Sequence, residues 1–335
     1  MSRGARALVA LLQDGELHSG AVLAKQLGVT RAAIWKLAGA LRDLGVGLES
    51  VPRRGYRLSR PVELLELGRI RAESLRLGLE LPEDIELDFE IDSTSDRLHR
   101  APPPPPDRPR LVFAEIQRAG RGRRGRSWVA PFGSGLTFSV GWTFTETPAG
   151  LSSLSLAVGA ALVRCLRELG ADQAMLKWPN DLLVFGRKLG GLLIQLRAES
   201  GAGASAVIGL GINLQLSEAT RAGIERPGVL PVADLAEALR GPLPGRNALA
   251  ATLAAAMLDA LKEFAAAGFE PFFEDWRSFD ALRDAPVTLL HGEERIEGVA
   301  RGADRDGALL LEVGNGTERF YSGDVSLRPS GALPR

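Results

Sequence analysis

The pattern of hydrophobic and polar positions predicts different structures for successive parts of the chain. Over residues 1–60, apolar residues recur at spacings of three and four in three short segments, which predicts three helices. The first helix closes at Gly15, the second is capped by Ser19 and ends at Gly28, and the third begins after Thr30. Because the turn between the second and third helices is short and contains a glycine, this segment favours a helix-turn-helix.

The segment after the third helix, LESVPRRGYRLS, predicts two strands joined by a basic turn, which would form the wing of a winged helix. Four cations lie on the third helix and this turn, the two elements that would face DNA: Arg31, Lys36, Arg53 and Arg54. Their placement favours nucleic-acid binding over the alternative, a three-helix bundle used for protein contacts. Trp35 departs from this pattern, because a polar residue that reads bases is expected on that helix.

Strand pairs alternate with helices over residues 61–284, which predicts a central α+β domain with a mixed or antiparallel sheet. Helices are expected over 62–78, 151–169 and 247–268. Strands are expected over 84–91, where the strand runs into a polar turn, and over 110–117, 135–144, 182–185, 189–197 and 206–216. The proline-rich residues 101–109 predict a stiff loop. Residues 285–335 contain short strands between Gly- and Asp-rich turns, and we expect a small SH3-like β-barrel there.

Composition narrows the possible partners and the cellular location. The chain has 335 residues and a formal net charge of zero, so an anion site must arise from local clustering of cations. Its single cysteine, Cys165, excludes an intrachain disulfide and a cysteine-based zinc site. Apolar runs are too short to span a membrane, and the basic N-terminus reads as an amphipathic helix rather than a signal peptide. We therefore expect a cytoplasmic protein with no membrane partner.

The segment AGRGRRGRSW, residues 119–128, matches both the dinucleotide fingerprint and a P-loop that has arginine in place of lysine. Both motifs need a strand before the loop and a helix after it. A strand precedes the loop, but the following segment contains Pro131 and several glycines and reads as a continuing strand. We therefore reject both motifs. A flexible cationic loop that closes over an anionic ligand is one interpretation, and a solvated basic loop or a non-specific nucleic-acid patch is the other.

Two further segments favour the ligand clamp. In LKWPNDLLVFGRKLGGLLIQL, Lys188 precedes Gly190 and Gly191, where a ligand could approach the backbone closely; the alternative is a plain hairpin with Trp178 in the core. In VIGLGINL, Asn213 needs a hydrogen-bonding partner if it is buried. Because the three histidines lie outside residues 100–290, chemistry here must rely on positioning and electrostatics, as in nucleotidyl transfer to a carboxylate.

Together, GRGRRGRSW, KWPNDLL, GRKLGG and GLGIN resemble the signatures of the biotin–protein ligase family over most of residues 88–215. The N-terminal segment resembles the winged helix of the bifunctional members, which also repress the biotin operon. The resemblance implies two steps. Biotin and ATP react to biotinyl-5′-adenylate and pyrophosphate, with Mg²⁺ present, and a lysine of the biotin carboxyl carrier protein then takes the biotin and releases AMP.

The resemblance also assigns residues. Biotin would be bound by Ser93, Thr94, Ser95 and Gln117, and the closing loop would contain Gly120, Arg121, Gly122, Arg123 and Arg124. Lys188 and Arg123 would be the catalytic residues, with Lys188 bridging the biotin carboxylate and the α-phosphate. Trp128 and Asn213 would hold the adenine. Lys177, Asn180, Asp181 and Gly191 would lie near the phosphates and Mg²⁺, with no resident metal site expected.

The polar turn reads Asp92-Ser93-Thr94-Ser95, where the family has asparagine at the last position, and serine has a shorter reach. The resemblance further implies a homodimer when the adenylate is bound and an operator that is an inverted repeat. Two alternatives stay open at this point: a lipoate–protein ligase, which shares the catalytic fold, and a ligand-sensing transcription factor without ligase activity.

Overall fold

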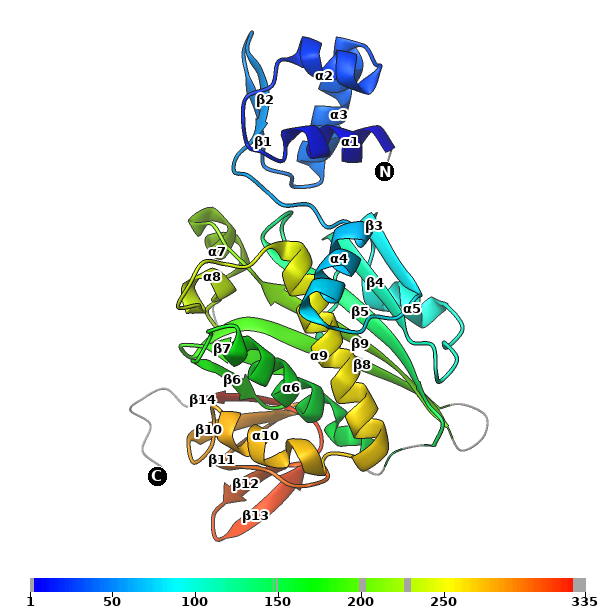
Figure 1. Cartoon of the computed structure of the whole chain (residues 1–335). Helices are drawn as coiled ribbons and strands as arrows, with labels where there is room; N and C mark the ends of the chain where they lie inside the picture. The colour runs from blue at the N-terminus through cyan, green and yellow to red at the C-terminus, as the bar shows by residue number, and fades with distance from the viewer. Residues whose placement is uncertain (1–2, 147, 149, 199–202, 226–229, 328–335) are drawn as a thin grey trace.

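The computed structural model describes residues 3–146, 148, 150–198, 203–225 and 230–327. The N-terminal domain contains α1 (Arg3–Leu12), α2 (Gly20–Leu27), α3 (Arg31–Asp43) and the antiparallel strands β1 (Leu48–Val51) and β2 (Gly55–Leu58). The side chains of Ser19 and Thr30 accept hydrogen bonds from the first turns of α2 and α3, and Gly28 ends α2 in the left-handed region. The predicted helix-turn-helix with its hairpin is confirmed (Figure 1).

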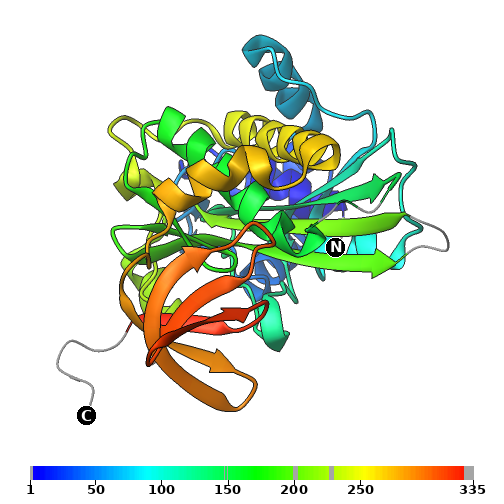
Figure 2. The same cartoon turned by 90° about the horizontal axis from the view of Figure 1, so that it is seen from below.

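The central domain is built on a seven-stranded sheet in the order β3-β4-β5-β9-β8-β7-β6. Its strands are β3 (Ile85–Ile91), β4 (Arg110–Gln117), β5 (Gly135–Phe144), β6 (Ala174–Lys177), β7 (Asp181–Val184), β8 (Arg187–Ala198) and β9 (Ala204–Asn213). Only β3 and β4 pair in parallel, so the sheet is mixed, as predicted. The long central strands β5 and β9 are almost wholly buried. Helices cover one face of the sheet, and other segments of the protein cover the opposite face (Figure 2).

The helices of the central domain are α4 (Leu67–Leu77), α5 (Thr94–Arg100), α6 (Leu154–Glu168), α7 (Glu218–Ile224), α8 (Leu235–Ala238), α9 (Arg246–Ala267) and α10 (Phe273–Phe279). Three short 3₁₀ turns accompany them at Arg123–Gly125, Leu151–Ser153 and Glu270–Phe272. The long helices α6 and α9 pack side by side on one face of the sheet (Figure 2). Their apolar side chains and those of β5 and β9 form the main core, in which Phe113, Phe138 and Phe264 are fully buried.

Several boundaries differ from the sequence prediction. The helix expected over 62–78 begins only at Leu67, because the backbone amides of Leu65 and Glu66 donate to side chains of other elements instead of forming a helical turn. The polar turn expected after β3 is the start of a helix, α5, in which Ser93 is the N-cap. The strand expected over 135–144 is confirmed as β5, whereas residues 127–134, which were expected to continue as strand, lie outside it. The short elements β6, α7, α8 and α10 were not predicted.

The C-terminal domain consists of five antiparallel strands in the order β13-β12-β11-β10-β14. These are β10 (Pro286–His291), β11 (Glu294–Ala303), β12 (Leu309–Val313), β13 (Gly316–Phe320) and β14 (Asp324–Leu327). The sheet is curled beside the central domain (Figure 2). Within the described residues β13 and β14 remain edge strands. The predicted β-domain is therefore confirmed, while its closure into an SH3-like barrel stays a prediction.

A buried polar network joins the linker after β2 to the central domain. The guanidinium of Arg246, at the start of α9, lies 2.8 Å from the carboxylate of Glu115 on β4, and both side chains are more than nine-tenths buried. Arg246 also donates to the carbonyl oxygens of Glu63 and Gly135, and Glu115 accepts from the amide of Leu65. Asn247 donates to the carboxylate of Glu63 and to the Leu64 carbonyl. Among the buried side-chain atoms of this cluster, Nε of Arg246 makes no hydrogen bond, and Oε2 of Glu115 has the Arg246 guanidinium as its ionic partner.

We expect Arg246→Met to lower the free energy of unfolding by about 3–5 kcal/mol, because it leaves the carboxylate of Glu115 buried without its cation. Urea titration of the full chain would measure this change. Arg240→Ala is the matched control: Arg240 pairs with Asp172 on the surface, so its loss should change stability by at most about 0.5 kcal/mol. Equal effects of the two variants would contradict the assignment of this network.

A second buried carboxyl predicts a pH effect. Burial raises the pKa of Asp280, at the end of α10, to about 6. In the unfolded chain its pKa is about 3.9, so the folded protein binds the additional proton and loses stability as the pH rises between these values. An asparagine at position 280 would keep the side-chain oxygen that accepts a hydrogen bond from the Leu282 amide at 3.0 Å. Relative to the parent, Asp280→Asn should therefore gain roughly 2–3 kcal/mol of unfolding free energy between about pH 4 and pH 7. Urea titrations across this range test it, and a constant difference would contradict it.

Candidate functional site

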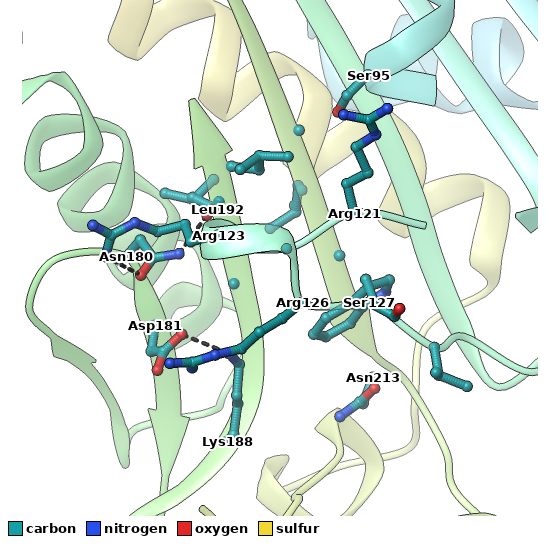
Figure 3. Close-up of a pocket in the computed structure, with 18 of the residues that line it drawn as sticks. Ser95, Arg121, Arg123, Arg126, Ser127, Asn180, Asp181, Lys188, Leu192 and Asn213 are labelled. Atoms are coloured by element: carbon teal, nitrogen blue, oxygen red, sulfur yellow. Dashed lines mark hydrogen bonds and ion pairs between the residues drawn. The ribbon is translucent and has the colours of Figure 1, made fainter. Parts of the chain in front are cut away.

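A cavity of about 410 Å³ lies where the segment between β4 and β5 crosses over β8 and β9 (Figure 3). The predicted residues that line it are Ser93, Thr94, Ser95, Gln117, Arg121, Gly122, Arg123, Trp128, Lys177, Asn180, Asp181, Lys188, Gly191 and Asn213. Residues that lie far apart in the sequence therefore surround one space. Two predicted residues do not line it: Gly120 packs against the backbone of Trp128, and Arg124 extends to the carbonyl of Leu290 on β10 and to the carboxylate of Asp324, each at 3.5 Å.

The glycine–arginine loop, residues 118–126, folds back on itself and does not lead into a helix. The amide of Gly122 donates to the carbonyl of Arg126 at 2.7 Å, and Trp128 donates to Gly120 at 2.8 Å. Arg124 occupies the left-handed region with a φ of 54° inside a short 3₁₀ turn. Both nucleotide motifs are therefore excluded by the geometry, since each requires a helix N-terminus after the loop.

The arginines of this loop extend in different directions across the cavity (Figure 3). Arg121 pairs with Asp96 of α5 at 2.9 Å, while Arg126 pairs with Asp324 of β14. Arg123 donates to the side chain of Asn180 and to the carbonyl of Gly323, each at 3.4 Å. Burial lowers the pKa of Arg123, and a cation desolvated in this way gains most from an anionic ligand.

Hydroxyl and amide groups gather at one end of the cavity. Gln117 accepts from the amide and the hydroxyl of Thr94, at 2.8 and 3.1 Å. Ser139 of β5 lies 2.8 Å from the hydroxyl of Thr94 and 3.0 Å from that of Ser95. Gly209 of β9 makes room for this cluster, because a Cβ there would lie 2.6 Å from the Ser95 hydroxyl. Neither Ser139 nor Gly209 was predicted as a site residue, since small residues in buried strands carry no distinctive signal.

Two lysines share one carboxylate in the wall of the cavity. Nζ of Lys188 lies 2.6 Å from one carboxylate oxygen of Asp181, and Nζ of Lys177 lies 3.1 Å from the other. Burial alone would raise the pKa of Asp181, but the charges and hydrogen bonds of Lys188 and Lys177 outweigh it and hold the pKa below its usual value. The trio thus carries one net positive charge, and Lys188 can release Asp181 for an anionic ligand while Lys177 still balances the carboxylate.

An indole and an amide line the other end. Trp128 lies against Gly211 of β9, where a Cβ would come within 2.4 Å of the indole ring. The Nε1 of Trp128 is buried and makes no hydrogen bond within the described part of the chain. Asn213 donates to the carbonyl of Ala233 at 2.9 Å, which confirms that this buried amide has a partner. Trp178 is a core residue, with its Nε1 bonded to the carbonyl of Gly307, so the simpler interpretation of that tryptophan is confirmed.

The four cations predicted to bind DNA lie elsewhere. Arg31 and Lys36 are exposed on α3, and Arg53 and Arg54 are exposed at the tip of the β1–β2 hairpin. In the described ranges, which omit 147, 149, 199–202, 226–229 and both ends, no three His, Cys, Asp or Glu side chains are grouped to hold a metal ion. None of the helices described is long and apolar enough to cross a membrane.

Comparisons with known proteins agree with this arrangement. Residues 89–213 match the biotin/lipoate A/B protein ligase family, residues 5–57 match an HTH domain, and residues 285–328 match the biotin protein ligase C-terminal domain. The bifunctional ligase/repressor BirA of Salmonella typhimurium is 40% identical over 325 residues, which cover 96% of each chain. The chain belongs to the biotin protein ligase family.

Two further relatives support membership of this family. BirA of Escherichia coli is 39% identical over 329 residues and 96% of each chain, and it too is described as a bifunctional ligase/repressor. Among solved structures, the biotin protein ligase of Aquifex aeolicus in complex with biotin and ATP superposes with a TM-score of 0.59 at 28% identity. That match covers 74% of this chain and 100% of the Aquifex chain. This chain therefore carries a helix-turn-helix domain at its N-terminal end in addition to the ligase domain.

Proposed function

We propose that the chain activates biotin with ATP to biotinyl-5′-adenylate and transfers the biotin to a lysine of the biotin carboxyl carrier protein. One observation carries the proposal: Lys177, Lys188 and three arginines of the loop line the same cavity as a cluster of hydroxyls and an indole. Biotin fits the hydroxyl cluster, where hydroxyls and an amide can bind its ureido group. Adenine fits against the indole of Trp128, beside Asn213. Their reacting groups, a carboxylate and a phosphate, then meet at the cations.

The first step joins two anions. An oxygen of the biotin carboxylate attacks the α-phosphorus of ATP, the new P–O bond forms, and the bond to the β-phosphate oxygen breaks to release pyrophosphate. Lys188 would turn from Asp181 to the two approaching anions and reduce their repulsion. Arg123, held by Asn180 and the Gly323 carbonyl, would bind the phosphates through its forked donors. In the second step a lysine amine of the carrier attacks the acyl carbon, loses a proton and displaces AMP.

Mg²⁺ fits this cavity as a companion of ATP and not as a resident ion. The two carboxylates that line the cavity, Asp181 and Asp324, are both engaged by cations. Mg²⁺ commonly keeps several waters and binds through substrate phosphates with one or two carboxylates. We therefore propose that the metal enters bound to the triphosphate, and that Asp181 can contact its hydration shell once Lys188 has turned away.

The N-terminal domain supports a second role. Its exposed cations on α3 and on the hairpin suit phosphate contacts on either side of a major groove. We propose operator DNA as the partner, with two copies of the chain on an inverted repeat and adenylate binding as the event that promotes pairing. We further propose domain boundaries after residues 60 and 284 and an SH3-like C-terminal barrel. Of the alternatives, lipoate ligation lacks a specific observation in its favour. A sensor without ligase activity would not need Lys188 in this cavity.

Pyrophosphate release on mixing the chain with biotin, ATP and Mg²⁺ tests the proposed activity. Lys188→Ala should reduce the rate by a factor of about 10² or more, because the charge that reduces the repulsion between the anions is lost. Lys188→Arg should remain impaired, since a planar fork does not replace a compact ammonium. Lys262→Ala is the control, because Lys262 lies on the surface of α9 and pairs with Glu80 and Asp259. Normal release by a folded Lys188→Ala protein would overturn the assignment, and release with lipoate in place of biotin would change the substrate.

The contact between Gly211 and Trp128 gives a separate prediction for the nucleotide end. In Gly211→Ala the new methyl group overlaps the indole, so Trp128 must leave its position. We expect ATP binding, measured by calorimetry, to weaken by about tenfold or more, since stacking on an aromatic side chain contributes about 1–3 kcal/mol per base. Gly223→Ala is the matched control: Gly223 also lines the cavity, but a Cβ there meets nothing within 4 Å. Unchanged affinity in Gly211→Ala would show that adenine does not rest on Trp128.

A further inference from the structure

Trp35 is held outside the core on the third helix of the N-terminal domain. The inner face of α3 buries Ile34, Ala38 and Leu41, whereas Trp35 has 64% of its surface exposed. The indole therefore adds little to the packing of its own domain. Single exposed apolar residues are common on protein surfaces, so the exposure of Trp35 does not by itself indicate a partner. The residues around Trp35 do indicate one.

Small residues and one cation lie beside Trp35 on the outer face of α3. Ala32 and Gly39 lie three and four residues away along the helix, and a Cβ on Gly39 would meet nothing within 4 Å. Arg31, four residues before Trp35, is the long polar side chain of this face. Trp35 therefore projects beside a cation from a face on which a second molecule could approach the backbone at Gly39. Its indole is the large apolar group there, and it is accessible.

The charge around Trp35 selects the kind of partner. Arg31 and Lys36 flank it on α3, and the helix has no acidic residue from Arg31 to Arg42. Arg53 and Arg54 add two exposed cations from the hairpin. The N-terminal domain lies at the opposite end of the molecule from the C-terminal sheet (Figure 1), and the side chains of Trp35, Arg31 and Lys36 are all exposed. An apolar group set among cations fits a polyanion that exposes apolar groups between its phosphates, which describes the major groove of DNA.

We propose that Trp35 determines DNA specificity by packing its indole against the C5-methyl group of thymine in the major groove. The inference rests on the proposed DNA binding and deepens it. In the major groove, thymine presents its methyl group beside the O4 acceptor, and apolar side chains read that methyl. The cations beside Trp35 then bind phosphates and position the helix without selecting sequence. Trp35 is the residue that distinguishes thymine from cytosine.

The test begins with the full-length chain in the presence of biotin, ATP and Mg²⁺. Duplexes that bind are selected from a random library at a fixed salt concentration, and each thymine of the enriched site is then replaced singly by deoxyuridine. The replacement removes one methyl group and leaves base pairing intact. At one position in each half-site, the parent should lose affinity by about fourfold, the value expected for burial of one methyl group.

Three variants separate base reading from other roles. Trp35→Ala should bind the thymine and deoxyuridine duplexes equally while pyrophosphate release stays at the parent level. Lys36→Ala should weaken binding of both duplexes by the same factor and reduce the dependence on salt, as the loss of a phosphate contact does. Leu75→Ala, on the exposed face of α4, is the matched apolar control and should change neither measurement.

The outcomes are distinct. A thymine-to-deoxyuridine effect that persists in Trp35→Ala, or that is absent in the parent at every position, overturns the role of Trp35 and leaves DNA binding in place. If no sequence is enriched by the parent, the proposed DNA binding fails and the inference fails with it, whereas ligase activity is unaffected. If Trp35→Ala instead lowers self-association in sedimentation without DNA, the indole faces a second copy of this chain, and the proposal is wrong.

Discussion

The pairing of Arg246 with Glu115 is the interaction on which the arrangement of the N-terminal and central domains depends. Two charges removed from water are tolerated only when their hydrogen-bonding groups are satisfied, and here the guanidinium also binds two carbonyl oxygens. One of these carbonyls belongs to Glu63 in the linker and the other to Gly135 at the start of β5. The same cluster therefore fixes the path of the linker and the beginning of a central strand. It also explains why residues 62–66 are not helical, since their amides and carbonyls are already engaged.

From this cluster the constraint extends to the cavity. Arg60, which precedes Pro61 in the same linker, donates to Ser134 and to Gln215. Ser134 in turn accepts from the amides of Leu214 and Gln215, which follow Asn213 at the end of β9. The linker thus contacts the residues that flank β5 and β9, the strands whose pairing aligns Thr137 with Gly211 and Ser139 with Gly209. The N-terminal domain is consequently joined by side-chain hydrogen bonds to the ends of two strands that line the cavity.

The sequence predicted those features that follow from local patterns. The caps at Ser19 and Thr30, the long strands β5 and β9 and the helices α6 and α9 have strong periodicity or distinct end signals, and they lie close to where they were expected. The short elements β6, α7, α8 and α10 were missed because segments of four to seven residues carry little periodic signal, and tertiary contacts decide their conformation. The late start of α4 has the same cause, because the side chains that engage its first residues come from β4 and α9.

For the cavity, sequence reasoning found the charged and polar residues and Gly191, but it did not identify the two glycines of β9 that make space. Lys188 and Arg123 stand out because their charged side chains indicate an anion site, whereas Gly209 and Gly211 look like ordinary members of a buried strand. Their role depends on what packs above them, the Ser95 hydroxyl and the Trp128 indole, and that contact exists only after β9 has paired with β5. Arg124 shows a second limit of sequence reasoning: the residue type alone does not predict where the side chain lies. Its neighbours Arg123 and Arg126 line the cavity, whereas Arg124, in a left-handed conformation, extends to the Leu290 carbonyl and to Asp324, which no count of arginines in the loop could reveal.

The distribution of charge connects both proposed functions. A chain with no net charge does not attract polyanions by its overall field, so each anion site must be assembled locally. In the cavity the cations are balanced by Asp96, Asp181 and Asp324, and an arriving phosphate must displace these carboxylates as partners. On α3 and the hairpin the cations lie in solvent, so phosphates need only displace water and small ions. The first arrangement favours a ligand that brings several charges to fixed positions, as a triphosphate does. The exposed cations on α3 and the hairpin do not distinguish one DNA sequence from another, so sequence selectivity must come from another group.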